Sequence, residues 1–330
     1  MITPSCAESI TRGAKLIASG ELVAFPTETV YGLGANGLSA EAVEKIYAVK
    51  GRPQNNPLIF HVSSIGQARE LVSVWPEEAE RIAQQFWPGP LTLVLPVRSS
   101  LQSPALAGGR TIALRMPDHP VARQLLAEAC VPIVAPSANR SGTLSPVTAQ
   151  HVWENFHNSV PLILDGGTCL VGIESTVLDL CYSPPRILRP GFFQPHDLQS
   201  VLPKLASFTA ESAFNSTAEP AASLTQPAEP FRSPGLLTRH YAPNIPLKLN
   251  QMDFPASSAA LLFKDEPNTA PAVNSTWYLG STPHAAESRL YKSLWEAQTT
   301  EGVTEIRVQP IPEGEPWDAL RDRLKRAAVQ

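Results

Sequence analysis

The sequence predicts an α/β protein in which a large, twisted, mixed sheet with flanking helices is followed by a small, open α/β domain of the Rossmann-like kind. Short aliphatic and β-branched runs alternate with amphipathic helical segments, and a Pro-, Ser- and Ala-rich stretch divides this alternation into a long and a short part. At 330 residues the chain is long enough for two domains. We place the larger domain at 1–203, a linker and lid segment at 204–245, and the smaller domain at 246–330.

Helices and strands alternate along the larger domain. The first helix is predicted to begin at a capping box formed by Ser5 and Glu8 and to end at Gly20. The periodicity predicts further helices over 39–51, 119–129 and 148–156, and strands over 21–26, 57–62, 91–97, 111–116, 131–137, 161–167, 175–180 and 186–191. In the smaller domain it predicts strands over 259–264, 275–280 and 305–311, and helices over 285–298 and 317–328.

Composition argues against several classes of protein and site. The net charge is −4 and no polybasic run is present, so we expect direct binding of nucleic acids, tRNA included, to be weak or absent. The four cysteines are widely spaced without a CxxC pair, which argues against a zinc site or a disulfide scaffold. No run approaches transmembrane length and the N-terminus lacks a signal core, so we expect a cytoplasmic protein without membrane contact.

The stretch "YGLGANG" matches a GxGxxG pattern at Gly32, Gly34 and Gly37. A dinucleotide site needs the first glycine directly after a strand and an acid about 20 residues further on. Here the preceding strand is predicted to end at Pro26, and that acid is missing. We therefore prefer a turn in which glycine supplies a positive φ.

Polar side chains gather at the predicted strand ends. Lys50 and Arg52 stand two residues apart with no acid beside them. They could simply stabilise the end of a helix, just as Ser137 and Asn139 could be turn formers and His61 a core histidine. Because several strand ends carry cations or small donors, we favour one shared site for phosphate or carboxylate oxygens. The candidates are Thr29, Lys50, Arg52, Asn56, His61, Thr111, Arg115, Ser137, Asn139, Ser145, Ser175 and Arg189.

Several long motifs carry a family resemblance. The segments "FPTETVYGLG", "KGRPQNNPLIFHV", "WPGPLTLVLP", "APSANRSGTLSPV", "GIESTVLDL" and "ILRPG" resemble the YrdC-type domain. The later segment "SPGLLTRHYAPNIPL" resembles the linker of two-domain L-threonylcarbamoyladenylate synthases, except that Leu237 and Thr238 stand where that family usually has a lysine and a tyrosine. The resemblance covers roughly residues 5–200 strongly and 233–330 moderately.

The resemblance implies a reaction. L-Threonine, bicarbonate and ATP would give threonylcarbamoyladenylate and pyrophosphate, and tRNA threonylcarbamoyl-transfer proteins would use the product beside the anticodon. Mg²⁺ would arrive with ATP. The resemblance assigns Lys50 and Arg52 to catalysis, and it assigns ATP binding to Lys50, Arg52, Asn56, Thr111, Ser137, Asn139, Ser145, Arg189, His240 and Tyr241. It assigns threonine binding to Thr29, His61, Arg115, Ala135 and Ser175.

Two other functions fit the same fold. One is a non-catalytic RNA-binding module, which the acidic net charge disfavours. The other is a carbamoyl-transfer domain of hydrogenase maturation, which would come with zinc-finger segments that this sequence lacks. Within the synthase interpretation, the Arg-His-Tyr cluster at 239–241 predicts that 233–246 acts as a lid over the nucleotide.

Overall fold

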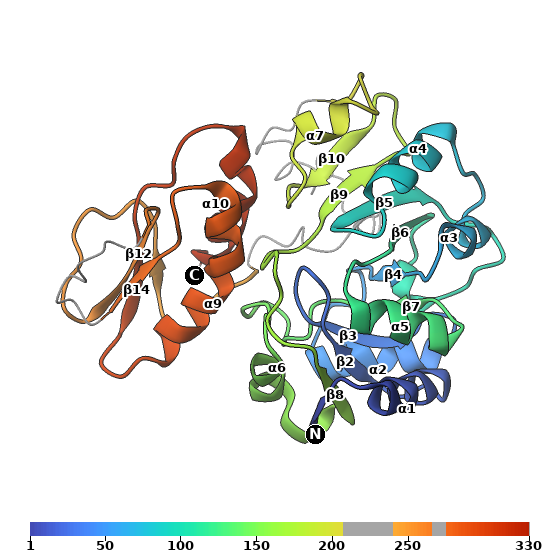
Figure 1. Ribbon diagram of the computed structural model, residues 1–330, viewed down its shortest axis with the longest axis horizontal. Coiled ribbons are helices and arrows are strands. Elements are labelled where there is room, and N and C mark those ends of the chain that lie inside the picture. Colours follow the sequence, from blue (N-terminus) through green and yellow to red (C-terminus); the bar gives the residue numbers. More distant parts are fainter. Residues whose placement is uncertain (207–239, 266–274, 330) are drawn as a thin grey trace, which may run out of the picture.

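The computed structural model describes residues 1–206, 240–265 and 275–329. Two domains lie side by side, with helices α9 (Pro283–Thr299) and α10 (Asp318–Ala327) of the smaller domain facing the larger one (Figure 1). The predicted linker falls mostly on 207–239, outside the described residues, as does the first part of the predicted lid. Among the described helices, none is long and apolar enough to cross a membrane.

The larger domain is built on one mixed ten-stranded sheet, as the sequence predicts. Its strand order is β1-β8-β2-β3-β7-β4-β6-β5-β9-β10, with parallel and antiparallel pairs interspersed. The strands are β1 (Ile2–Pro4), β2 (Val23–Phe25), β3 (Gly32–Asn36), β4 (Ile59–His61), β5 (Leu91–Pro96), β6 (Thr111–Arg115), β7 (Ile133–Val134), β8 (Leu162–Asp165), β9 (Thr176–Asp179) and β10 (Arg186–Arg189).

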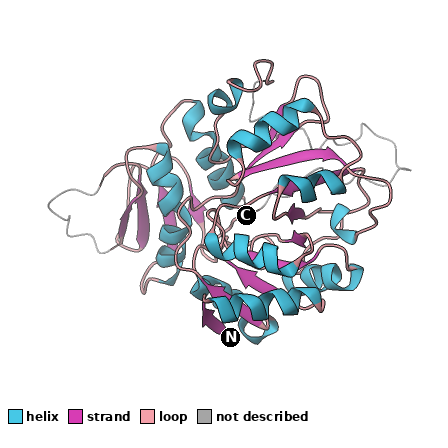
Figure 2. Ribbon diagram, turned by 45° about the vertical axis from the view of Figure 1, so that its right-hand side comes forward, coloured by secondary structure: helices cyan, strands magenta, loops and turns pink. Residues whose placement is uncertain are grey.

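Helices lie on both sides of these strands (Figure 2). The helices of this domain are α1 (Ala7–Ala18), α2 (Ala40–Lys50), α3 (Ile65–Leu71), α4 (Glu77–Phe86), α5 (Pro120–Ala129), α6 (Ala149–Phe156) and α7 (Pro195–Gln199). One apolar cluster joins α1 and α5 to β2, β7 and β8. A second, larger cluster contains residues of α2, α3, α4 and α6 and continues into α9 and α10, so burial of apolar surface also holds the two domains together.

The smaller domain has the predicted open α/β form. Its four parallel strands follow the order β11-β14-β12-β13, and α9 and α10 pack beside them. The strands are β11 (Leu247–Lys248), β12 (Ser258–Leu262), β13 (Thr276–Tyr278) and β14 (Glu305–Val308). Helices α3, α4 and α7 and strands β1, β3 and β11 were not anticipated. All except α4 span seven residues or fewer, which is too short for a clear periodicity, whereas α4 has a well-defined apolar face that was overlooked.

The GxGxxG glycines supply no positive φ, so that prediction is wrong, although Gly37 does lie in the turn after β3. Gly32 and Gly34 lie within β3, Gly37 follows it, and none of the three has a positive φ. A Cβ on Gly34 would lie 2.7 Å from Cε1 of Phe25, and one on Gly37 would lie 2.8 Å from Cε1 of Phe60. The glycines are needed because large aromatic side chains pack against the bare backbone.

The predicted capping box of α1 is also wrong. The N-cap is Cys6, whose backbone N–H donates to Oγ of Ser9 at 2.9 Å. Ser5 instead donates to the carbonyl of Asp165 at 2.7 Å, which ties the helix start to the end of β8. The predicted stops hold: Gly20 follows α1 with a φ of 84°, and Gly51 ends α2 in the left-handed region.

A buried acid lies where α9 meets the larger domain. Oε2 of Glu287 is 3.1 Å from Nδ1 of His284, whose ring stacks on Phe192 at 4.6 Å. The carbonyl of Glu287 is so close to Gly172 that a Cβ there would lie 2.7 Å from it. Burial raises the pKa of Glu287 to about 7, while His284 opposes that shift.

This raised pKa makes stability depend on pH. Ionised Glu287 disfavours the folded state, so stability should fall as the pH rises from about 4.5 through 7. We predict that Glu287→Gln raises the free energy of unfolding at pH 8 by up to about 3 kcal/mol, because a pKa difference of about 2.5 corresponds to that energy, and that it has little effect at pH 4.5. Urea denaturation at both pH values measures this. The control Glu296→Gln, on an exposed position of the same helix, should change stability by less than about 0.5 kcal/mol at either pH. Equal effects of Glu287→Gln at pH 4.5 and pH 8 would contradict the prediction.

Candidate active site

One cavity collects most of the polar residues singled out in the sequence. β4 and β6 are parallel and pair His61 with Arg115 in register, while Ser175 precedes β9 and Arg189 ends β10. These strand ends therefore open into the same space. The cavity is lined by Thr27, Thr29, Val30, Tyr31, Gly32, Arg52, Ile59, His61, Arg115, Ala135, Pro136, Ser137, Glu174, Ser175, Arg189, His240 and Tyr241.

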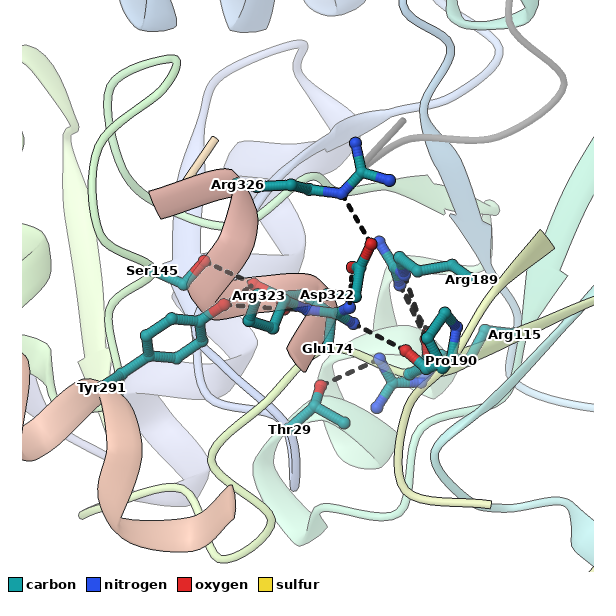
Figure 3. A network of polar contacts seen from close by, with 11 residues as sticks. Thr29, Arg115, Ser145, Glu174, Arg189, Pro190, Tyr291, Asp322, Arg323 and Arg326 are labelled. Atoms are coloured by element: carbon teal, nitrogen blue, oxygen red, sulfur yellow. Dashed lines mark hydrogen bonds and ion pairs between the residues drawn. The ribbon is translucent and has the colours of Figure 1, made fainter. Parts of the chain in front are cut away.

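Arg115 is fixed on one wall of this cavity (Figure 3). Its Nη1 donates to Oγ1 of Thr29 at 2.9 Å and its Nε donates to the carbonyl of Gly89 at 3.3 Å. Its Nη2 lies 2.7 Å from Oε1 of the buried Glu28, without the alignment of a hydrogen bond. The guanidinium is thus held in a fixed orientation, as a preorganised carboxylate receptor requires.

Arg52 and Arg189 bring two further guanidinium groups to the cavity. Arg52 donates to the side-chain oxygen of Asn56 at 2.6 Å and to the carbonyl of Pro57 at 2.9 Å. Arg189 donates to the carbonyl and the hydroxyl of Ser175 at 2.9 and 3.1 Å. Burial lowers the pKa of Arg52 to about 10, so this side chain is still charged at neutral pH.

Lys50 takes a different position from Arg52. Its Nζ donates to the carbonyl of Ser137 at 2.6 Å and also to the carbonyl of Asn139. These acceptors are 87 and 89 residues away in sequence, which is why no partner was visible locally. Burial, together with Arg52, lowers the pKa of Lys50 well below its ordinary value. Lys50 ties the end of α2 to the loop that presents Ser137 to the cavity.

Five of the predicted site residues do not line the cavity, and Lys50 is one of them. Asn56 supports Arg52, and the side chain of Asn139 donates to the carbonyls of Arg140 and Thr143. Ser145 donates to Oε1 of Glu174 at 2.5 Å. Thr111 begins β6 at the end away from Arg115, about 13 Å along the strand.

Two buried histidines face the cavity in their neutral form. Burial lowers the pKa of His61 to about 3, and Arg115 adds to that effect. Burial likewise lowers the pKa of His240 to about 3. Near pH 7 both rings therefore offer one donor and one acceptor nitrogen and no charge.

The segment at His240 and Tyr241 closes one side of the cavity. Tyr241 has a φ of 63°, an uncommon value for a bulky side chain, and neighbouring hydrogen bonds hold it there. The N–H of Ala242 donates to the carbonyl of Gly142 at 2.9 Å, and the N–H of His240 donates to the carbonyl of Arg326 at 3.3 Å.

Several buried polar atoms around this closure have no hydrogen-bond partner among the described residues. They are Nδ2 of Asn56, Oδ1 of Asn139, Nδ1 of His240 and the hydroxyl of Tyr241. Buried polar atoms in folded proteins nearly always have a hydrogen-bond partner, so these unpaired atoms indicate a site that binds a polar ligand.

Sequence reasoning missed the contribution of the smaller domain. Glu174 lines the cavity and was visible only as the acid before Ser175. Its carboxylate accepts hydrogen bonds from Arg323 of α10 at 2.8 Å and from Tyr291 of α9 at 3.0 Å. No local pattern marks Arg323, because its role depends on how the two domains pack.

Comparison with known proteins settles the family. Residues 15–191 match the family described as "Telomere recombination", and residues 195–329 match "Threonylcarbamoyl-AMP synthase, C-terminal domain". The threonylcarbamoyl-AMP synthase of Pyrococcus abyssi is 38% identical over 96% of this chain and 92% of its own length. The chain belongs to the threonylcarbamoyl-AMP synthase family. A relative of the same name in Bacillus subtilis is 43% identical over 73% of this chain and 66% of its own length.

A solved member of the family has the same fold. The crystal structure of the Pyrococcus abyssi protein complexed with L-threonine covers 99% of this chain and 97% of its own, with a TM-score of 0.83 and 34% identity. The structure of the Escherichia coli YciO protein covers 58% of this chain and 95% of its own with a TM-score of 0.51, and at 20% identity it shows the fold alone. These matches confirm the YrdC-like fold that the motifs predicted.

Proposed function

We propose that the protein synthesises L-threonylcarbamoyladenylate from L-threonine, bicarbonate and ATP and releases pyrophosphate. The cavity in which Arg115, Arg52 and Arg189 converge carries this proposal, because the reaction needs one receptor for a carboxylate and others for a triphosphate. A relative that aligns over nearly the whole chain has been solved with L-threonine, which supports the amino acid as substrate. The relatives' name favours catalysis over a non-catalytic RNA-binding module.

L-Threonine is proposed to lie beside Arg115. The guanidinium fork would bind the carboxylate, while Thr29, Ser175 and the neutral ring of His61 would contact the hydroxyl and the carbamate. Ala135 lines the same wall and limits the space available to the side chain. A neutral histidine suits this position because a second cation would compete for the carboxylate.

The triphosphate is proposed to meet Arg52, Arg189 and Ser137, with His240 and Tyr241 covering the nucleotide. The amine of threonine adds to bicarbonate with loss of water to give a carbamate. The carbamate oxygen then attacks the α-phosphorus, the bond from that phosphorus to the bridging β-phosphate oxygen breaks, and pyrophosphate leaves. Such transfers depend on positioning and charge neutralisation more than on a protein nucleophile. Lys50 contributes by holding the loop at Ser137, and we expect Nδ1 of His240 and the hydroxyl of Tyr241, which line the cavity, to pair with the ligand.

Mg²⁺ is proposed to enter as part of the nucleotide substrate. In the described ranges, no group of three His, Cys, Asp or Glu residues could hold a metal ion. The triphosphate oxygens would then be the main ligands of the ion. We further propose a cytoplasmic location and use of the product by tRNA threonylcarbamoyl-transfer proteins.

The reaction can be tested directly. Incubation of the protein with Mg²⁺-ATP, L-threonine and bicarbonate should release pyrophosphate, and omission of either L-threonine or bicarbonate should abolish the release. L-Serine, which lacks the methyl group, provides the matched substrate control. Pyrophosphate release that does not depend on threonine would contradict the proposed function.

Arg115→Lys tests the proposed threonine receptor. Lysine retains the charge opposite Glu28 but cannot form two parallel hydrogen bonds to a carboxylate, so the KM for threonine should rise about 10- to 100-fold. The KM for ATP should change by less than about threefold, because Arg115 is not assigned to the phosphates. Arg110→Ala, at an exposed position just before β6, is the control and should leave both constants unchanged. An equal rise in both constants for Arg115→Lys would place Arg115 at the phosphates instead.

A further inference from the structure

A buried polar network joins the smaller domain to the back of the cavity (Figure 3). Arg323, on α10, is fully buried at its centre. Its Nε donates to Oε2 of Glu174 at 2.8 Å, its Nη1 to Asp322 at 2.6 Å, and its Nη2 to the carbonyl of Pro190 at 2.9 Å. Each of the three guanidinium nitrogens therefore donates to an acceptor, and two of these acceptors lie in the larger domain.

The partners of Arg323 adjoin the residues that form the cavity. Glu174 precedes Ser175, and Pro190 follows Arg189, while Arg189 and Ser175 are bonded to each other. Arg323 therefore holds both chain segments that carry the Arg189–Ser175 pair. Its Cζ also lies 5.2 Å from the centre of the Tyr241 ring, close enough for a cation–π contact with the closing segment.

The rest of the network makes this arrangement rigid. Asp322 also accepts a hydrogen bond from Nε of Arg326 at 2.8 Å, and the carbonyl of Arg326 accepts one from the N–H of His240. Glu174 accepts further hydrogen bonds from Ser145 and Tyr291. α9 and α10 thus fix the position of Glu174 in the cavity and of the closing segment at His240 and Tyr241.

Charge gives Arg323 a second effect on the cavity. Glu174 is a carboxylate on the wall of a site proposed for a polyanion, where a bare negative charge would repel phosphate. Burial alone would raise the pKa of Glu174, but Arg323 and Arg189 outweigh that effect and keep the carboxyl ionised. The same ion pair with Arg323 neutralises the charge that the nucleotide would otherwise meet.

We propose that Arg323 is a positioning residue for the nucleotide site, through which the smaller domain holds Arg189, Ser175 and Tyr241 in their binding arrangement and neutralises Glu174. The inference rests on the proposed function for the identity of the ligand. If Arg323 has this role, the smaller domain is required for catalysis because it positions residues of the site, in addition to any contribution that it makes to the stability of the fold.

The test compares Arg323→Met with Arg307→Met in the full-length protein. Arg307 forms ion pairs with Asp253 and Glu305 inside the smaller domain, so its loss removes an arginine of that domain without touching the network. At a temperature where circular dichroism shows both variants folded, we expect Arg323→Met to weaken ATP binding in calorimetry about tenfold and to lower kcat at least tenfold. Arg307→Met should stay within about twofold of the unaltered protein in both measurements.

Two further variants separate position from charge and from folding. Arg323→Lys keeps the positive charge and can be used if Arg323→Met does not fold. Its kcat should still fall at least about tenfold, because a lysine cannot contact all the acceptors of Arg323 at once. Adding Glu174→Gln to Arg323→Met should restore part of the ATP affinity, since the uncompensated charge is gone, but not kcat.

The outcomes distinguish this inference from the proposed function. A folded Arg323→Met variant with ATP affinity and kcat within twofold of the unaltered protein would overturn the inference. If the unaltered protein binds ATP but releases no pyrophosphate with threonine, the proposed function fails, and the ATP affinities of the Arg323 and Arg307 variants still decide the inference. Failure of the unaltered protein to bind ATP would overturn both.

Discussion

The fold depends on hydrogen bonds and ion pairs that offset the cost of burying basic side chains around one cavity. An isolated cation in a protein interior is costly unless it is paired and hydrogen-bonded. The buried basic residues of this region are Lys50, Arg52, Arg115, Arg189, Arg323 and Arg326. Lys50, Arg115 and Arg323 are held by groups from distant parts of the chain, so for these three the compensation of charge depends on assembly of the fold. The hydrogen bonds of Arg52 and Arg326 also reach residues within five positions in the sequence.

The groups that hold each cation differ, and they determine whether its positive charge is available to a ligand. Carbonyl groups of a loop satisfy Lys50, and a carboxylate and a hydroxyl hold Arg115. Two carboxylates and a carbonyl hold Arg323, which therefore supports the site from behind. Arg52 lines the cavity wall, and its hydrogen bonds go to carbonyl and amide oxygens, which carry no negative charge. An anionic substrate supplies the missing negative charge, and fixed donors of this kind stabilise charge that develops during a reaction without having to reorganise.

Much of the fold could be predicted from the sequence, because its strands and longer helices have clear periodicity. Candidate site residues could be chosen from the sequence because polar side chains follow the predicted strands. Of these candidates, Thr29, Arg52 and Arg115 do meet in one cavity. The positive φ predicted for the GxGxxG glycines was wrong, because Gly34 is required by an aromatic ring from another strand and not by its own backbone conformation.

The remaining features depend on contacts between segments far apart in sequence. The acceptors of Lys50 lie nearly 90 residues further along the chain, and Arg323 reaches Glu174 across 149 residues and a domain boundary. No motif of a few residues can encode such pairs. The same holds for Thr111, whose alternation with Arg115 placed it correctly on one face but said nothing about which end of the strand carries the site.

A crystal structure with a non-hydrolysable ATP analogue and L-threonine tests most directly the claim that the cations are arranged in advance for a polyanion. The account predicts phosphate oxygens within hydrogen-bond distance of Arg52 and Arg189, with both guanidinium groups within about 1 Å of the positions described above. Arg323 should still bridge Glu174 and Pro190. Phosphates bound outside this cavity, or guanidinium groups that swing to new positions to reach them, would contradict the account.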